Sequence, residues 1–206
     1  MARPRGAALE PPRGLIMAFT LQDIEQLFVE RGHRAYDGEP VTQLQHALQT
    51  AALAEQAGAA PALITACLLH DLGHLIADRP GTPSLDGLDD KHQYFVLPFL
   101  RGLFGAAVLD PIRLHVEAKR YLCFVEPDYD ALLSADSRRS LVLQGGSFDA
   151  GQAVDFASMP GAPDAIRLRR WDDMAKKPDL ATESLDYYLH IAEGVASPSR
   201  QPAAIW

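Results

Sequence analysis

The chain has 206 residues, of which 48% are hydrophobic and 22% charged, so it is long enough for one globular domain with a substantial core. A formal net charge of -8 argues against a general nucleic-acid-binding protein, because affinity for a phosphate backbone needs a dense basic face. No apolar run approaches the roughly 20 residues that span a bilayer, which disfavours a membrane protein.

Both ends of the chain are expected to lie outside the folded domain. The first segment, MARPRGAALEPPRG, carries three arginines and three prolines but no apolar signal core, which predicts a disordered tail over residues 1–16. Met17 is an alternative start. We expect one domain over residues 17–194 and a flexible tail over residues 195–206.

Helical patterns begin directly after the first tail. Thr20 can cap a helix over about 21–32, a second helix runs from about Val41 to Ala57 with Gly58 as its stop, and Pro61 opens a third that carries His70 and Asp71. A turn-rich connection is predicted over residues 78–88.

The second half of the chain continues as helices. Asp89 or Asp90 can cap a helix that contains His92 and is bent or interrupted at Pro98, and Asp110 and Pro111 open a helix through His115 and Lys119 that ends at Pro127. Shorter helices are predicted at about 128–143, 149–157, 162–176 and 183–194. Strand signals are almost absent, so the predicted fold class is all-α, a compact helical bundle.

The two cysteines, Cys67 and Cys123, lie far apart in apolar helical contexts and lack a metal-type Cys-x-x-Cys spacing. This usage favours a reducing compartment, so we expect a cytoplasmic protein.

Histidines in the predicted helices form the most informative pattern. Five of the seven lie in helical segments near other polar residues: His46, His70, His74, His92 and His115. His70 and Asp71 are adjacent, and burying such a pair is costly unless a metal ion compensates. His70 and His74 are four residues apart, which predicts that they share one helix face. A lone core histidine is more often structural, but histidines on successive helices are the pattern from which bundles build metal sites.

Several longer motifs carry a specific resemblance: VTQLQHALQTAALAEQAGA, LLHDLGHL, HVEAKRYL, LSADSRRSL, LQGG and RRWDD. With the order His46, His70–Asp71 and a later aspartate, they resemble the all-helical HD-domain superfamily, most of whose members are metal-dependent phosphohydrolases. Within it they resemble the phosphonate-degrading oxygenases, mixed-valent di-iron enzymes that cleave the carbon–phosphorus bond of 1-hydroxyphosphonates. The resemblance covers about Tyr36 to Asp173, roughly two thirds of the chain.

The resemblance implies two iron ions, Fe(II) and Fe(III), with dioxygen (O2) as co-substrate. It implies six protein ligands: His46, His70, Asp71, His92, His115 and Asp172. Asp71 would bridge the irons, His46 and Asp172 would complete one, and His92 and His115 would complete the other. Imidazole and carboxylate suit iron, whereas a histidine-rich second site is less natural for magnesium.

The expected substrate is a small organophosphonate, which needs several donors and positive charge. These can be supplied by Lys119, Arg169, Ser137, Ser140 and His74. Alternatively, Lys119 and Arg169 are solvated surface residues and the two serines simply cap or line a helix.

The resemblance also assigns roles to Tyr36 and Glu39, three residues apart before the His46 helix. Tyr36 would occupy an iron position until substrate displaces it, and Glu39 would sense an ammonium group, with the Tyr36 ring as a cation–π face. The implied substrate is 1-hydroxy-2-aminoethylphosphonate or its trimethylammonio counterpart, giving phosphate and glycine or glycine betaine. The alternative is that Tyr36 and Glu39 are an ordinary pair of loop residues with no role in the site.

The chain departs from the family after His92, where QYFVLPF brings the bulky Tyr94 and Phe95 and the helix-bending Pro98 in place of acidic and small residues. Because of this departure, the resemblance does not define the shape of the pocket on this side. His33 and His190 have no partner in the pattern and are expected to be structural or exposed.

Two other functions remain alternatives at this stage. A metal-dependent HD phosphohydrolase acting on a nucleotide or another phosphate ester would use most of the same ligands. A nucleotide-sensing or structural HD module is the third reading, although such modules often lose ligands and this chain has all six. The protein is expected to be a monomer or a homodimer.

Overall fold

The computed structural model describes residues 18–36, 38–77 and 81–197. Within these ranges the chain forms twelve helices, and the only extended pairing is an isolated bridge between Ala35 and Thr42. The all-α prediction is confirmed. The tail expected over residues 1–16 and most of the one expected over 195–206 lie outside the described residues.

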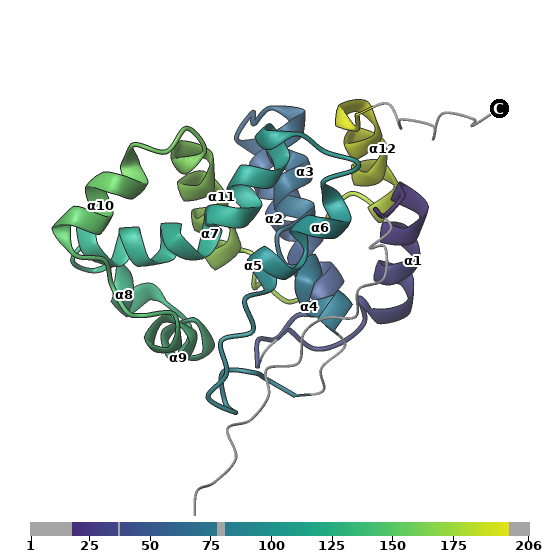
Figure 1. The fold of residues 1–206 in the computed structure, drawn as a ribbon. Helices are drawn as coiled ribbons and strands as arrows, with labels where there is room; N and C mark the ends of the chain where they lie inside the picture. Colours follow the sequence, from purple (N-terminus) through teal and green to yellow (C-terminus); the bar gives the residue numbers. More distant parts are fainter. Residues whose placement is uncertain (1–17, 37, 78–80, 198–206) are drawn as a thin grey trace, which may run out of the picture.

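Most of the helices follow one another with short connections, and longer ones join α1 to α2, α4 to α5 and α11 to α12 (Figure 1). In chain order they are α1 (Leu21–Arg31), α2 (Gln43–Gln56), α3 (Pro61–Leu69), α4 (Leu72–Ala77), α5 (His92–Phe95), α6 (Leu97–Leu100), α7 (Ala106–Val125), α8 (Tyr129–Leu132), α9 (Ala135–Leu143), α10 (Ala150–Ala157), α11 (Ala162–Met174) and α12 (Leu185–Val195).

Local sequence signals account for many of the helix ends. Thr20, Thr42 and Asp149 each close a capping box with the side chain three residues later, which satisfies backbone N–H groups that have no partner inside the helix. Pro61 opens α3 as predicted. Gly58 follows α2 with a φ of 67°, a left-handed conformation that favours glycine and ends the helix.

The predicted continuous helix through His70 and Asp71 is wrong. α3 ends at Leu69, His70 and Asp71 form a turn, and α4 begins at Leu72. His70 and His74 therefore lie in different elements rather than on one helix face. The break accompanies a close approach of α4 to α5, where a Cβ atom at Gly73 would lie 2.3 Å from the carbonyl oxygen of His92.

The start predicted for the long helix is also corrected. α7 begins at Ala106, not at Asp110, and Pro111 lies inside it. A proline in the second turn removes only one hydrogen bond, and the added first turn buries Val108 in the core.

The start of α5 differs from the predicted cap. Its N-cap is Lys91, in a left-handed conformation with a φ of 52°, rather than Asp89 or Asp90. Asp90 instead accepts a hydrogen bond from the backbone N–H of His92 at 3.3 Å. The predicted interruption is present, with the break at Val96 because Pro98 lies in the first turn of α6.

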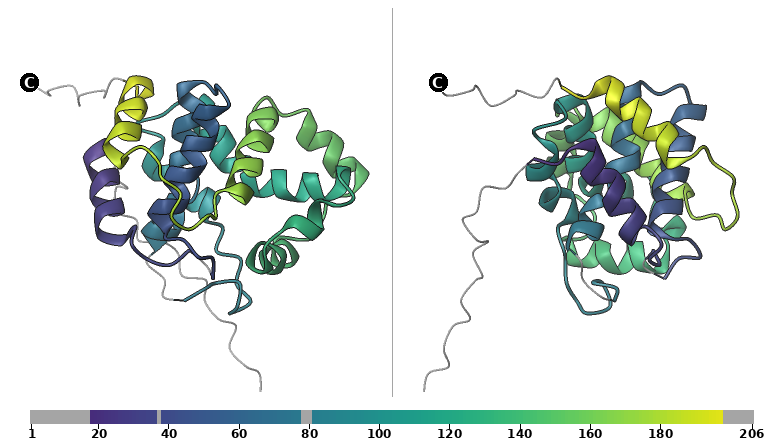
Figure 2. Two further views of the ribbon diagram at one scale, coloured as in Figure 1. Left: turned by 180° about the vertical axis from the view of Figure 1, so that it is seen from behind. Right: turned by 90° about the vertical axis from the view of Figure 1, so that its right-hand side faces the viewer.

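Three apolar clusters hold the helices together. The largest unites buried side chains of α1 to α4, α6, α12 and parts of α7 and α11. Two smaller clusters join the C-terminal half of α7 to α10 and α11, and to α8 and α9. Figures 1 and 2 show the consequence: α7 runs from the α2–α3 region towards the part of the molecule formed by α8 to α10.

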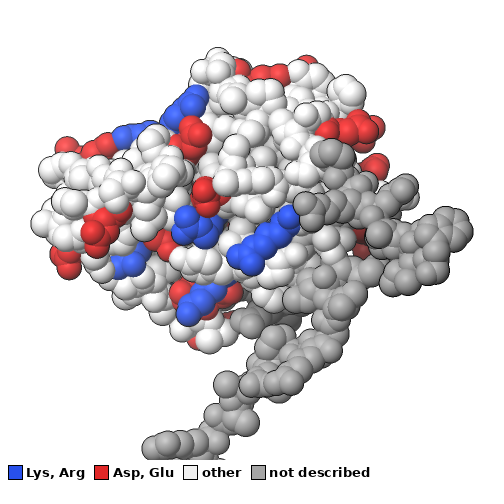
Figure 3. Space-filling model, turned by 45° about the horizontal axis from the view of Figure 1, so that its top comes forward, with Lys and Arg blue, Asp and Glu red and all other residues white. Residues whose placement is uncertain are grey.

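The surface carries charges of both signs. On the face drawn in Figure 3, acidic and basic side chains are interspersed. None of the helices in the described part of the chain has the length and apolar character that a bilayer crossing requires.

Candidate metal centre and adjoining pocket

Three helical elements bring His46, His70 and Asp172 together. His46 lies on α2, His70 at the end of α3 and Asp172 on α11, and all three are buried. The Nε2 atom of His46 lies 3.2 Å from His70 Nε2 and 3.4 Å from Asp172 Oδ1. These atoms are close enough together to bind one metal ion.

A second group contains His92 from α5 and His115 from α7, whose Nε2 atoms are 3.0 Å apart. Asp71 lies between the two groups. Its Oδ2 atom is 3.3 Å from His70 Nε2 and 3.5 Å from His46 Nε2, and its Oδ1 atom is 3.3 Å from His92 Nε2 and 3.7 Å from His115 Nε2. Asp71 thus offers one oxygen to each group, as a bridging ligand would.

Hydrogen bonds fix which nitrogen of each buried imidazole faces the centre. Because a carbonyl oxygen only accepts, each Nδ1 atom that contacts one carries a proton, and in the neutral ring the Nε2 atom presents a lone pair. The three contacts of this kind are His46 to Ala175 O at 2.9 Å, His70 to Cys67 O at 2.8 Å and His115 to Ile112 O at 2.7 Å.

These lone pairs and the carboxylates form a donor set that fits metal ions. In the neutral rings the Nε2 lone pairs of each histidine pair face one another, and the buried Oδ1 atom of Asp172 has no hydrogen-bond partner. A polar atom buried without a partner is costly, so a cation between these atoms would supply the missing interaction.

The charge states of the carboxylates suit the same role. Burial acts to raise the pKa of Asp71, but the charge and hydrogen bonding of His70 outweigh it and hold this pKa well below the usual range. Burial likewise opposes ionisation of Asp172, and the Arg169 charge outweighs it, so the pKa of Asp172 is also well below usual. Both are therefore anionic donors at neutral pH.

Asp90 is a site residue that the sequence reasoning treated only as a helix cap. Its Oδ1 atom accepts from His92 Nδ1 at 2.9 Å, and its Oδ2 atom is 2.8 Å from His74 Nδ1. The His74 and His92 rings stack with centroids 4.0 Å apart. One carboxylate therefore orients two imidazoles, and the only sequence signal was an acidic residue two positions before a histidine.

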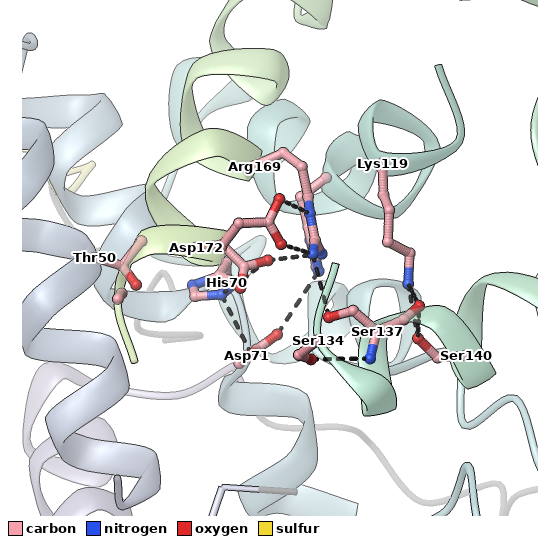
Figure 4. Close-up of polar contacts among 12 residues, drawn as sticks. Thr50, His70, Asp71, Lys119, Ser134, Ser137, Ser140, Arg169 and Asp172 are labelled. Carbon is pink, nitrogen blue, oxygen red and sulfur yellow. Dashed lines mark hydrogen bonds and ion pairs between the residues drawn. The ribbon is translucent and has the colours of Figure 1, made fainter. Parts of the chain in front are cut away.

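A pocket adjoins the centre and contains the predicted phosphonate donors. Its lining includes His74, Lys119, Ser137, Ser140 and Arg169. Lys119 is only 2% exposed, and its Nζ atom donates to Ser140 Oγ at 2.7 Å and to Ser137 O at 3.3 Å (Figure 4). Burial, with repulsion from Arg169, lowers the pKa of Lys119 to about 7.

Arg169 lines this pocket beside the predicted metal ligands Asp71 and Asp172. Its guanidinium group pairs with Asp172 Oδ2 at 2.8 Å and with Asp173, and it lies 3.5 Å from Ser137 Oγ (Figure 4). Arg169 is buried, as Lys119 is, so the alternative that these two cations are solvated surface residues is wrong.

Tyr36 and Glu39 occupy different environments. The Tyr36 hydroxyl donates to Asp71 Oδ2 at 2.9 Å, and its ring stacks on His46 with centroids 3.9 Å apart. Tyr36 lines the pocket, but Glu39 is not part of the lining in the described structure. The Glu39 carboxylate instead pairs with Lys176 Nζ at 3.3 Å, a partner that the sequence reasoning did not identify.

Comparisons with known proteins agree with this geometry. The profile of the HD-domain family matches residues 44–136. The chain is 38% identical over 193 residues to 1-hydroxy-2-(trimethylamino)ethylphosphonate dioxygenase (glycine-betaine-forming) of Leisingera caerulea, with 93% of each chain covered. It is 43% identical over 164 residues to hydroxymethylphosphonate dioxygenase of Gimesia maris, with 79% of this chain and 81% of the relative covered. The chain belongs to the phosphonate-dioxygenase branch of the HD-domain family.

Within this HD-domain chain, the family match ends before the last predicted ligand. Residues 44–136 include His46, Asp71 and the second histidine pair, whereas Asp172 comes from α11 beyond the match. Long-range packing of α11 against α2 and α7 is therefore needed to complete the site.

The departure after His92 lies outside the pocket lining in the described part of this HD-domain chain. Tyr94 and Phe95 are 42% and 46% exposed, and neither is among the pocket-lining residues of the described structure. These two side chains are therefore directed largely to the surface, whereas His92 faces the centre. His33 and His190 are exposed, as predicted.

Proposed function

We propose that this chain is a non-haem di-iron dioxygenase that cleaves the carbon–phosphorus bond of a 1-hydroxyphosphonate and releases phosphate. The observation that carries the proposal is the position of Asp71, with one oxygen towards each pair of histidines, beside a pocket that contains Lys119. Both relatives are named as dioxygenases that act on phosphonates, which supports oxidative chemistry on this class of substrate.

Two groups of residues would hold the metal ions. His46, His70 and Asp172 would hold one, His92 and His115 the other, and Asp71 would bridge them. When bound, an iron pair supplies redox chemistry with dioxygen as co-substrate, and donor sets rich in imidazole suit iron better than magnesium.

The other side chains bind and orient the substrate. The Lys119 ammonium group and the Arg169 guanidinium group would neutralise the phosphonate, with the Ser137 and Ser140 hydroxyls as further hydrogen-bond partners. His74, whose ring is paired with Asp90, would also contact the substrate. The Tyr36 hydroxyl, which is hydrogen-bonded to Asp71, would be displaced when the substrate hydroxyl approaches the centre.

The substituent on carbon 2 is the open chemical detail. The amine or trimethylammonium group expected from the sequence, with glycine or glycine betaine as product, corresponds to the name of the Leisingera relative. The Gimesia relative is named for hydroxymethylphosphonate, which has no second carbon. The proposed reaction covers both because the carbon–phosphorus bond and the 1-hydroxyl group are shared.

The experiment is phosphate release by iron-loaded protein, with and without dioxygen, from hydroxymethylphosphonate, 1-hydroxy-2-aminoethylphosphonate and its trimethylammonio counterpart. We expect release only when dioxygen is present. Phosphate release without dioxygen would contradict the proposed dioxygenase activity. Manganese-supported hydrolysis of phosphate esters, with no reaction under iron and dioxygen, would favour the phosphohydrolase instead.

The cytoplasmic location and the monomeric or homodimeric state remain predictions from the sequence. The non-enzymatic HD module is the less favoured alternative, because all six predicted ligands converge at the centre.

A further inference from the structure

Lys176 lies in the segment after α11 and contacts two residues of the pocket wall. Its Nζ atom is 3.4 Å from Ser137 Oγ and 5.9 Å from the centre of the Tyr36 ring. The side chain is only 13% exposed. A partly buried cation in this position is an electrostatic component of the pocket even though it is not part of the lining.

The groups around this ammonium are those that proteins use to recognise a cation. Glu39 Oε1 and Ser134 Oγ each lie 3.3 Å from Lys176 Nζ, and the ammonium group lies over the face of the Tyr36 ring. A carboxylate, hydroxyl oxygens and an aromatic face together form an ammonium subsite. In this chain the subsite is filled by the protein's own lysine.

The backbone around Lys176 is anchored to α2. Ala175 O accepts from His46 Nδ1 at 2.9 Å, and Gln49 exchanges hydrogen bonds of 2.8 and 3.1 Å with the backbone of Lys177. The backbone therefore cannot move without disturbing a predicted metal ligand. The Lys176 side chain, in contrast, can swing away from Glu39 by rotation about its own bonds.

The subsite is also tied to the substrate side of the centre. The backbone N–H of Glu39 donates to Tyr36 O at 2.7 Å, so the carboxylate and the ring belong to one turn. A ligand group that enters beside Tyr36 and Ser137 therefore meets the Glu39–Lys176 pair.

We propose that Lys176 determines specificity for the substituent on carbon 2 of the phosphonate. A substituent with a positive charge binds beside Glu39 only when Lys176 leaves the carboxylate, because two cations that share one subsite repel each other. An uncharged substituent, or none, binds with the Glu39–Lys176 pair intact. The inference rests on the proposed function, since it requires a phosphonate bound beside Ser137.

The test is anaerobic calorimetry on the metal-loaded protein with two probes: hydroxymethylphosphonate and 1-hydroxy-2-(trimethylamino)ethylphosphonate. The variant is Lys176→Met, which keeps an unbranched side chain but removes the charge. Lys177→Met is the matched control because Lys177 is the exposed neighbour.

We expect Lys176→Met to tighten binding of the trimethylamino probe by about tenfold, which corresponds to about 1.4 kcal/mol. Binding of hydroxymethylphosphonate should be unchanged or weaker, because the unpaired Glu39 carboxylate attracts a cation and repels a phosphonate. Lys177→Met should change neither affinity. Glu39→Gln is the reciprocal variant. It should weaken the binding of the trimethylamino probe relative to the binding of hydroxymethylphosphonate.

Two outcomes would overturn the inference. If Lys176→Met or Glu39→Gln changes both affinities by the same factor, the pair has a structural role and does not set specificity. If the wild-type protein binds neither phosphonate, both the proposed function and this inference fail. The failure of the inference alone is therefore distinguishable from the failure of the proposed function.

Discussion

Lys119 is a buried cation that depends on its surroundings for its charge. Its ammonium group donates to Ser140 Oγ and Ser137 O, and burial together with the nearby Arg169 charge lowers its pKa from 10.5 to about 7. Below this pH the group is protonated and attracts an anion. Above it the group becomes neutral, and the pocket loses one positive charge.

We therefore predict that phosphonate affinity falls as the pH rises through about 7. Lys119→Arg should remove this dependence, because a guanidinium group stays protonated. Calorimetric titration with hydroxymethylphosphonate between about pH 6 and pH 9 measures it. Titration of the phosphonate itself is common to both proteins, so identical pH profiles would contradict a role for the Lys119 charge.

Asp90 provides a second prediction at the residue scale. Asp90→Asn should lower metal affinity by roughly 10- to 100-fold, because an amide cannot accept from both the His92 and His74 rings. Metal content after dialysis against graded chelator concentrations measures the change. Asp89→Asn is the matched control, since the Asp89 carboxylate accepts from the backbone of Lys91. Equal metal retention in the two variants would show that Asp90 does not position the ligand.

At the scale of elements, the contact between α4 and α5 determines where His92 lies. A Cβ atom at position 73 would lie 2.3 Å from His92 O, so Gly73 is required by the close approach of the two backbones. We predict that Gly73→Ala lowers the free energy of unfolding by about 1–3 kcal/mol and weakens metal retention.

Urea denaturation of the metal-free protein measures the stability change, and Gly194→Ala is its control. A Cβ atom at Gly194 meets nothing within 4 Å in α12, so this variant should be stabilised by up to about 1 kcal/mol. A Gly73→Ala protein as stable as the wild type would mean that α4 and α5 separate easily.

The helix boundaries show which elements local sequence controls. Thr20 and Pro61 begin helices as predicted, because capping and the fixed φ of proline act within a few residues. The break at His70 and the early start of α7 were not predicted. Both depend on packing against distant elements, which periodicity along one segment does not report.

At the scale of the whole molecule, the predicted ligands connect five parts of the chain: α2, the α3–α4 turn, α5, α7 and α11. A metal bound by all of them stabilises the folded state because the unfolded chain does not assemble the site. At about 100 times its Kd, a bound ligand adds about 2.7 kcal/mol.

We therefore predict that chelation lowers the Tm and that iron restores it. His70→Ala should abolish this metal-dependent shift, whereas His190→Ala should retain it because the His190 side chain is 86% exposed on α12. Differential scanning calorimetry measures both. If the Tm of the wild-type protein does not change when metal is removed or added, a metal centre at these residues is contradicted.

The sequence by itself determined the helical class, most helix ends and the candidate ligands. Helical periodicity and capping are local, and the motifs around His46, His70–Asp71 and His115 are contiguous in the chain. Lys119 and Arg169 were also identified as phosphonate donors, although their burial was not.

Only the tertiary structure decided how these groups meet. It placed Asp71 between the two histidine pairs, joined Asp90 to two rings, and paired Glu39 with Lys176 across 137 residues of sequence. The reason is physical: each contact depends on the relative positions of separately formed helices, which their shared apolar packing sets. Local patterns specify the helices, and their packing specifies the chemistry of the site.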